Sequence, residues 1–279
     1  ESFQTPEALI VHSDQGLGAL SRTFHTLLRT RMARGPWRDR RRPVALNTYE
    51  ALYMNVDERN VMELADQAAD LGMELVVVDD GWFGQRDWDD ASIGDWAAHP
   101  VKFPRGLKPV ADHVHGLGLK FGLWFEPEMV NADSDLYRAH PDWVLGDATY
   151  ELSIGRHQYV LDLTRPEVRD HIVEALSAVI GGNDVDYVKW NMNRSLSEVF
   201  SAAWPAEAQG EIYHRYVLGY YDLMSRLLER FPELLIEAGS GGGARLDPAV
   251  LAFSPQHWIS EDTDAMERVK IQYGTSYAY

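Results

Sequence analysis

Four short clusters of polar and aromatic residues each follow an apolar, β-rich stretch of the sequence. They lie at residues 79–82, 124–128, 189–194 and 260–264, and they are rich in carboxylates, amides, amines and tryptophans. In parallel α/β folds the carboxyl ends of neighbouring strands meet at one edge, so residues far apart in the sequence become neighbours. We therefore expect the four clusters to line one shared pocket.

The side chains in these clusters suit the binding of a hexose. Asp79 and Asp80 can accept hydrogen bonds from two adjacent hydroxyls, while Lys189 can donate one from the same side. Trp82 and Trp124 could supply flat walls for the C–H faces of a sugar ring. Each residue taken singly could instead be a helix cap or a core residue. Their common position at four strand ends favours the binding interpretation.

Other chemistries are disfavoured. The glycine-rich stretch 240–243 lacks both the dinucleotide-binding spacing and the lysine of a phosphate-binding loop, so close approach to an uncharged ligand fits it better. The ten histidines show no metal-binding spacing, and the absence of cysteine excludes disulfides and thiol nucleophiles. We therefore expect no metal and no cofactor.

The overall charge limits the partners. The chain has 43 acidic and 26 basic residues, and its formal net charge of −17 repels nucleic acids and anionic membranes. The hydrophobic fraction of 45% is enough for a large core, and no apolar run approaches the length needed to cross a bilayer. We expect a globular protein that binds neither nucleic acid nor membrane.

To bring the clusters together, the chain must form a parallel sheet wrapped by helices. From residue 44 onward, apolar β-rich runs alternate with amphipathic stretches. The seven expected strands are 44–50, 74–80, 120–126, 159–163, 187–191, 234–238 and 257–261. The expected helices include 59–71, 107–117, 166–180, 211–230 and 264–272. A closed barrel of this kind needs eight strands. We therefore predict an α/β fold of the (β/α)8 TIM-barrel type, truncated after the seventh strand–helix unit.

Four motifs resemble the α-galactosidases of glycoside hydrolase family 36. They read VDDGWFG at 78–84, FGLWFEPEMV at 121–130, YVLDLT at 159–164 and VKW at 188–190. The resemblance implies a retaining exo-enzyme that removes terminal α-linked galactose from raffinose-type oligosaccharides, as in melibiose and raffinose catabolism. It implies a small oligosaccharide as the substrate and no metal or cofactor.

The resemblance also implies a domain organisation. Family members carry a β-sandwich before the barrel and a β-domain after it. Residues 1–43 would then be the connector and tail of the preceding β-sandwich, and residues 44–279 the catalytic barrel, incomplete at its C-terminus. Residues 276–279 would be a short eighth strand or the start of further chain. We expect a cytoplasmic location, with secretion as the alternative, and a homo-oligomer as in longer family members.

Site roles follow from the resemblance position by position. Asp79 and Asp80 would hold the 4- and 6-hydroxyls of galactose. The family's nucleophile falls on Asn191 and its acid/base on Glu261, where the family has aspartate at both positions. The remaining substrate-binding positions are Tyr49, Trp124, Arg156, Lys189, Asn193, Gly239 and Gly241.

Four pocket positions depart from the family pattern. Asn191 is a poor nucleophile, so we expect an α-galactosidase whose hydrolysis is crippled, whereas Glu261 keeps a carboxyl group. Tyr49 stands for a tryptophan, and Gly239 stands for a cysteine near the 2-position of the sugar. The extra room makes an α-N-acetylgalactosaminidase an alternative. A non-catalytic sugar-binding protein and an engineered barrel fragment are the others.

Overall fold

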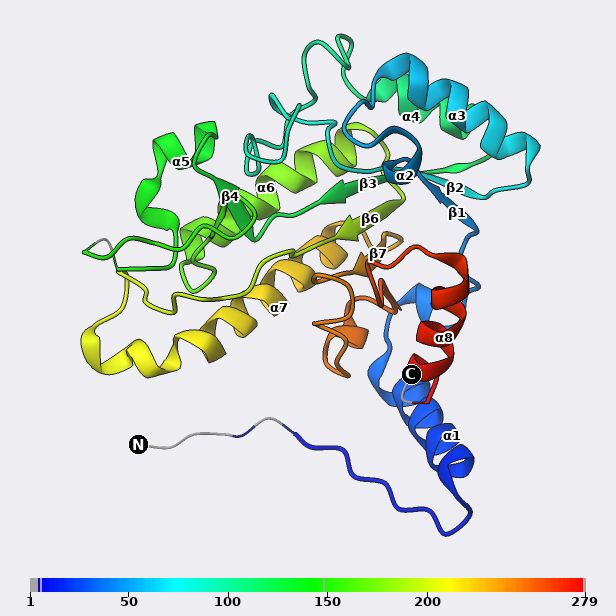
Figure 1. Cartoon of the computed structure of the whole chain (residues 1–279), viewed down its shortest axis with the longest axis vertical. Coiled ribbons are helices and arrows are strands. Elements are labelled where there is room, and N and C mark those ends of the chain that lie inside the picture. Colours follow the sequence, from blue (N-terminus) through cyan, green and yellow to red (C-terminus); the bar gives the residue numbers. More distant parts are fainter. Residues whose placement is uncertain (1–4, 6, 148, 278–279) are drawn as a thin grey trace.

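The computed structural model describes residues 5, 7–147 and 149–277, and its central element is a curled parallel sheet (Figure 1). Within the described residues this sheet has six strands in the order β1-β2-β3-β6-β7-β8, and every neighbouring pair is parallel. The strands are β1 Ala45–Asn47, β2 Leu75–Val78, β3 Lys120–Phe125, β6 Tyr187–Trp190, β7 Leu235–Ala238 and β8 Gln256–His257. The predicted α/β class is confirmed.

Helices follow the strands and pack beside the sheet. α3 contacts α4 and β2, α4 contacts β3, and α6 contacts α7, as Figure 1 shows. These helices and the last one are α3 Glu58–Asp70, α4 Lys108–Gly116, α6 Pro166–Gly182, α7 Ile212–Arg230 and α8 Ala265–Thr275. Two short helices, α2 Tyr49–Leu52 and α5 Asp135–Ala139, lie in the connections. The five expected helices are therefore confirmed, with small shifts at their ends.

Local signals explain where several helices begin. The side chain of Asp57 accepts a hydrogen bond from the amide of Asn60 and caps α3. Asp264 caps α8 in the same way through the amides of Met266 and Glu267. A carboxylate at this position satisfies amides that have no partner in the first turn and complements the helix dipole.

One predicted strand does not join the main sheet. Residues 159–163 were expected to form a barrel strand, but β5 (Gln158–Val160) pairs antiparallel with β4 (Met129–Asn131) in a separate two-stranded sheet. Beyond it, the amide of Leu161 donates to the carbonyl of Glu128 at 2.9 Å. The run is apolar because its side chains are mostly buried. An apolar run indicates burial without indicating which backbone it pairs with.

The two ends of the sheet do not meet. β3 pairs directly with β6, and within the described residues β1 and β8 have no partner on their outer edges. The expected strand 257–261 is short and shifted, since β8 covers only Gln256–His257. α8 ends at Thr275, residues 276–277 form a turn, and residues 278–279 lie outside the described residues. The described sheet is therefore a half-barrel.

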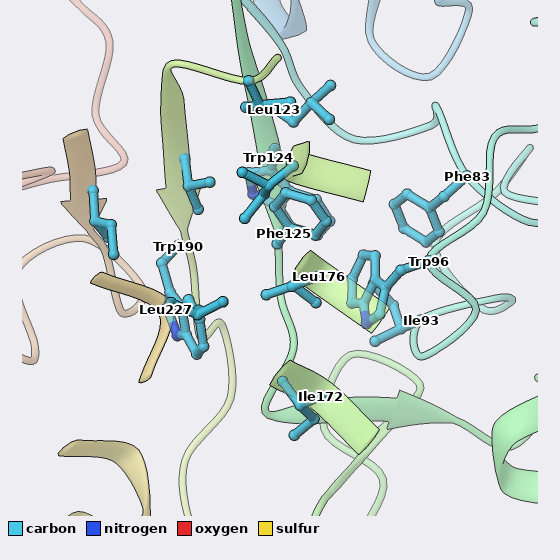
Figure 2. Packing of buried hydrophobic residues seen from close by; sticks show 14 of the residues in the cluster. Phe83, Ile93, Trp96, Leu123, Trp124, Phe125, Ile172, Leu176, Trp190 and Leu227 are labelled. Atoms are coloured by element: carbon cyan, nitrogen blue, oxygen red, sulfur yellow. The ribbon is translucent and has the colours of Figure 1, made fainter. Parts of the chain in front are cut away.

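A continuous apolar core anchors the strand ends. Figure 2 shows Phe125 of β3 near Leu176 of α6 and Trp96 of the loop after β2, and Trp190 of β6 and Leu227 of α7 belong to the same core cluster. The rings of Phe125 and Trp96 lie 5.3 Å apart, edge to face. Because these residues sit at the ends of β3 and β6, the core fixes the backbone from which the polar clusters project.

The described residues before β1 are tied to the loop that precedes β7 by a polar contact. They include α1 Leu17–Leu27, a π-helical turn over Leu28–Met32 and a 3-10 turn over Pro36–Arg38. The indole of Trp37 donates to the carbonyl of Glu233 at 2.8 Å. The predicted domain boundary at residue 43 stays a prediction. None of the helices in the described ranges is both long and apolar enough to cross a membrane.

Candidate functional site

A cavity of about 570 Å³ lies where the strands give way to their loops, and we call it the strand-end cavity. The structure brings together residues from all four sequence clusters here, as expected. Of the predicted site residues, those that line it are Tyr49, Asp79, Asp80, Trp124, Arg156, Lys189, Asn191, Asn193, Gly241 and Glu261. Gly239 is not a lining residue but lies directly behind Asn191.

Asp79 and Lys189 form an ion pair at the cavity wall. The Nζ atom of Lys189 lies 3.0 Å from Oδ2 of Asp79, and both side chains are largely buried. Oδ2 also accepts a hydrogen bond from Nδ2 of Asn47 at 2.5 Å. Burial lowers the pKa of Lys189, but the charges of Asp79, Glu237 and Glu261 outweigh it and raise the pKa above its ordinary value. Lys189 is therefore a fixed cation facing the cavity.

Asp80 is held by a buried arginine. Its two carboxylate oxygens accept hydrogen bonds from Nε and Nη2 of Arg86, both at 2.9 Å. Arg86 is fully buried and also donates to the carbonyl of Ala91 at 2.9 Å. A bidentate pair of this kind fixes a carboxylate in one orientation and leaves lone pairs on both oxygens for a further donor. Asp80 is thus oriented before any ligand enters.

Asn191 and Glu261 lie on either side of one glycine-rich turn. A Cβ atom added to Gly239 would lie 3.0 Å from Oδ1 of Asn191, while the amide of Gly242 donates to Oε1 of Glu261 at 2.8 Å. Three peptide units span at most about 11 Å, so this turn keeps the two side chains on a common stretch of wall. Oδ1 of Asn191 also accepts from the amide of Met192 at 3.0 Å.

Two glycines of the glycine-rich turn have different surroundings: Gly242 packs against protein backbone, and Gly241 lines the cavity. Gly241 and Gly242 have φ of 50° and 78°. A Cβ atom at Gly242 would lie 2.9 Å from Cα of Ser260, whereas Gly241 has open space around it and lines the cavity. The predicted close approach to a ligand therefore concerns Gly241, and Gly242 is required by packing against the segment that carries Glu261.

Arg156 reaches the cavity from a strained turn. It and the following residue, His157, have φ of 54° and 60°, in the left-handed region that side chains rarely adopt. The turn precedes β5, and Arg156 lines the cavity. Its position therefore depends on the surroundings that hold this backbone in place.

The aromatic walls differ from the expectation. Trp124 lines the cavity, but the prediction for Trp82 is wrong, because Trp82 is fully buried in the core and its indole donates to the carbonyl of Trp124 at 2.9 Å. Trp258 lines the cavity instead. Its indole donates to Oε2 of Glu261 at 3.1 Å, and Nζ of Lys189 lies 5.2 Å from its ring centre. Residues at a strand exit point to alternate sides, so the sequence position alone did not separate wall from core.

Sequence reasoning missed several polar residues of the cavity. Nε2 of Gln256 donates to Glu237 at 2.7 Å and to the hydroxyl of Tyr187 at 3.0 Å. Burial and the charge of Glu237 raise the pKa of Tyr187 well above its ordinary value. Glu237 lies opposite Lys189 on the neighbouring strand. An acidic residue in one expected strand that could pair with a lysine in another was the sequence signal that could have identified Glu237 as a cavity residue. The missed lining residues that carry polar side chains are Asn47, Glu50, Tyr187, Glu237, Gln256 and Thr263, together with Trp258.

The described residues contain no group of three or more histidine, aspartate or glutamate side chains placed to hold a metal ion. A second cavity, of about 560 Å³, adjoins the first and shares Asn193 and Gly241 with it. Its lining includes four tyrosines of α7 and Arg245, whose guanidinium binds the buried carboxylate of Glu128 at 2.6 and 3.0 Å.

Comparison with known proteins gives a consistent result. Residues 2–279 match the family model described as Melibiase. The α-galactosidase AgaA of Geobacillus stearothermophilus is 52% identical over 279 residues, which cover 100% of this chain and 38% of that protein. The α-galactosidase Mel36A of Lactobacillus acidophilus is 50% identical with the same coverage. The chain thus spans well under half the length of these relatives.

Solved structures agree with the sequence matches. The crystal structure of the family 36 α-galactosidase AgaA from Geobacillus stearothermophilus superposes with a TM-score of 0.94 at 52% identity, covering 96% of this chain and 37% of that one. Substituted variants of AgaA have been solved in complex with stachyose and with raffinose, with TM-scores of 0.93 and 0.94.

Proposed function

The chain belongs to the melibiase family, and from this premise we propose that its strand-end cavity binds a terminal α-linked galactose of raffinose-type oligosaccharides. We assign the chain to the catalytic region of a retaining exo-α-galactosidase. The observation that carries this proposal is the convergence of Asp79, Lys189, Asn191 and Glu261 on one cavity of about 570 Å³. That volume is typical of small-ligand sites.

The walls of the cavity support the binding of a polyhydroxylated ring. Asp79 and Asp80 are held by Lys189 and Arg86, so their free lone pairs face fixed positions where hydroxyl donors can bind. We propose that these carboxylates accept the 4- and 6-hydroxyls. Pre-orientation reduces the ordering cost of binding, so it favours affinity for a rigid ligand.

Further contacts would come from the other side of the cavity. We assign Arg156, Lys189 and Asn193 as donors to the remaining hydroxyls, with Trp124 as a flat wall. Tyr49 lines the same cavity, and burial together with the charges of Asp80 and Asp79 raises the pKa of its hydroxyl, so it stays neutral and can donate.

Catalysis would use Asn191 and Glu261 as the two groups that flank the scissile glycosidic bond. A retaining mechanism needs one carboxylate to attack the anomeric carbon and a second carboxyl group, about 5 Å away, to protonate the leaving oxygen. Glu261 can serve as the acid/base. The carboxamide of Asn191 carries no charge and is a weak nucleophile, so we propose that this chain binds its substrate well and hydrolyses it slowly.

Asn191→Asp is the direct test of this assignment. Restoring the carboxylate should raise the rate of aryl α-galactoside hydrolysis by about a thousandfold or more, because the covalent step depends on it. Asn55→Asp makes the same exchange at an exposed position outside the cavity and should leave the rate unchanged. A folded Asn191→Asp protein with no gain in rate would contradict the role of position 191.

A second candidate is a sugar-binding protein without catalysis, which the neutral side chain of Asn191 favours. Both candidates predict galactose binding by the unmodified chain in calorimetry, so the Asn191→Asp protein separates them, and binding without any turnover by that protein supports the second candidate. An N-acetylgalactosaminide is a further alternative motivated by the glycine at position 239, although Gly239 does not line the cavity and a Cβ atom there would lie only 3.0 Å from Oδ1 of Asn191. Comparing aryl α-galactoside with aryl α-N-acetylgalactosaminide in the Asn191→Asp protein decides which sugar the cavity prefers.

We also propose that the open sheet is part of a (β/α)8 barrel. The unpaired edges of β1 and β8 and the 38% coverage of AgaA favour closure by further strands in a longer protein, with residues 1–43 as the connector from a preceding domain. Homo-oligomer formation is part of the same proposal. An isolated barrel fragment without activity is the alternative, and it would be supported if the folded Asn191→Asp chain neither binds nor hydrolyses galactosides.

A further inference from the structure

Glu126 lies behind the strand-end cavity and contacts two of the segments that line it. It follows β3 directly and is 1% exposed. One of its carboxylate oxygens accepts a hydrogen bond from the backbone amide of Asn193, and the other accepts from Nε2 of Gln158 at 2.9 Å. Asn193 lines the cavity, and Gln158 is two residues from the cavity residue Arg156.

We infer, on the basis of the proposed function, that Glu126 is a positioning residue that fixes the separation of Arg156 and Asn193 across the cavity. Its carboxylate bonds the side chain of Gln158 and the backbone amide of Asn193, and Arg194, the neighbour of Asn193, adds a second link through the carbonyl of Gln158. A sugar held by donors on opposite walls requires those walls at a set distance, and a displacement of about 1 Å is costly.

The turn that carries Arg156 needs this support. Two consecutive residues with φ of 54° and 60° cost free energy that the surroundings must supply. Nδ2 of Asn131 donates to the carbonyl of His157 at 2.8 Å. Nη1 of Arg194 donates to the carbonyl of Gln158 at 2.6 Å. Glu126 adds the contact to the side chain of Gln158, and it alone of these three also binds the amide of Asn193.

The Glu126–Gln158 pair can adopt two arrangements. Burial raises the pKa of Glu126 to about 7, against the opposing effect of the hydrogen bonds from Asn193 and Gln158. Among the described residues, Oε1 of Gln158 is buried without a hydrogen-bond partner. A protonated Glu126 can donate to this oxygen if the Gln158 amide turns over, and the present bond from Nε2 is then replaced by one in which Glu126 is the donor.

Of the charged groups around Glu126, Asp80 and Arg194 are already bound to other partners. Arg156 on the turn lowers the pKa of Glu126 and Asp80 after β2 raises it. Arg86 binds Asp80, and Arg194 binds backbone carbonyls of the turn segment. Protonation of Glu126 is therefore the local change that rearranges its link between the two walls near neutral pH, while the bond from Arg194 to the carbonyl of Gln158 stays in place.

The test is galactose binding by calorimetry from about pH 5.5 to 8.5, a range that brackets the pKa of Glu126. In the unmodified chain we expect the affinity to fall about tenfold as the pH drops through about 7, because the carboxylate form makes both hydrogen bonds. Glu126→Gln mimics the protonated acid, so it should show the low-pH affinity throughout and no dependence on pH.

Glu151→Gln removes an exposed carboxylate from the segment before the same turn and should behave like the unmodified chain. If Glu126→Gln binds galactose like the unmodified chain at every pH, the positioning role is wrong. Should that variant not fold, Gln158→Leu decides, because unchanged affinity without the Nε2 donor would overturn the inference equally. A folded unmodified chain that binds no galactose at any pH would instead defeat the proposed function.

Discussion

At the scale of single residues, the cavity is built from charges that are paired before a ligand arrives. Asp79 is bound by Lys189, and Asp80 is bound on both oxygens by Arg86. Removing one partner of such a buried pair typically costs several kcal/mol, because the other charge is left unpaired. Asn191, which we propose for the nucleophile position, is the exception, because its amide is neutral.

Glu126 gives a prediction on stability with a defined sign. Its pKa in the folded protein is about 7, above the ordinary 4.5, so the folded state binds the proton more tightly than the unfolded chain does. Its stabilising contribution is complete below about pH 4.5 and is lost as the pH rises through about 7, by up to about 3 kcal/mol. Glu126→Gln, which cannot ionise, should therefore be more stable than the unmodified chain at about pH 8.

Urea denaturation at about pH 5 and pH 8 checks this prediction. The two proteins should differ at the higher pH and converge at the lower one. A loss of stability in Glu126→Gln at both values would mean that the carboxylate serves folding alone. A gain in stability together with weaker galactose binding is the pattern of a residue kept for the site at a cost to the fold.

At the scale of elements, close packing of helices on the sheet region positions the strand ends. α7 approaches the segment after β5 so closely that a Cβ atom at Gly219 would lie 2.2 Å from the carbonyl oxygen of Leu163. Glycine within a helix normally lowers stability relative to alanine, so its presence here has a packing reason. The same carbonyl accepts a hydrogen bond from Arg169 of α6, which ties both helices to one turn.

Gly219→Ala should therefore destabilise the protein by about 2 kcal/mol, because α7 must move away from backbone that cannot yield. Gly182→Ala is the matched control, since Gly182 ends α6 and has open space around its Cβ position. That exchange should be neutral or stabilising by about 0.5 kcal/mol. Thermal unfolding of the two variants compares them directly. Equal effects would show that helix propensity, and not the contact with Leu163, governs position 219.

At the scale of the whole molecule, two features oppose each other. The net charge of −17 keeps copies of the chain apart, while the outer edges of β1 and β8, which have no partner among the described residues, offer backbone groups to another chain. α8 adds three exposed apolar side chains, with Met266, Val269 and Tyr273 at 72%, 64% and 65% exposure. Whether charge repulsion or association prevails depends on ionic strength, because salt screens the charges and leaves apolar and edge contacts in place.

We expect the isolated chain to associate reversibly, and more strongly as salt rises from about 0.05 M to 0.5 M. Light scattering after size exclusion measures this. Val269→Lys should reduce the association, whereas Leu71→Lys, which changes an equally exposed apolar residue at the end of α3, should not. A monomer under all conditions would contradict the role assigned to the open edges and α8.

The sequence by itself determined the five expected helices, six of the seven expected strands and about half of the residues that line the strand-end cavity. Amphipathic period, apolar runs and capping residues such as Asp57 and Asp264 are local, so the printed residues contain them. The family motifs indicated that Asn191 and Glu261 belong to one site, and both residues line the strand-end cavity.

Only the tertiary structure decided which partner each buried group takes. It placed Gln158–Val160 in a side sheet, buried Trp82, brought Trp258 to the cavity wall and joined Glu126 to both Gln158 and Asn193. The physical reason is that a sequence pattern reports how strongly a residue avoids water. The direction of a side chain and its hydrogen-bond partner depend on backbone that lies tens of residues away.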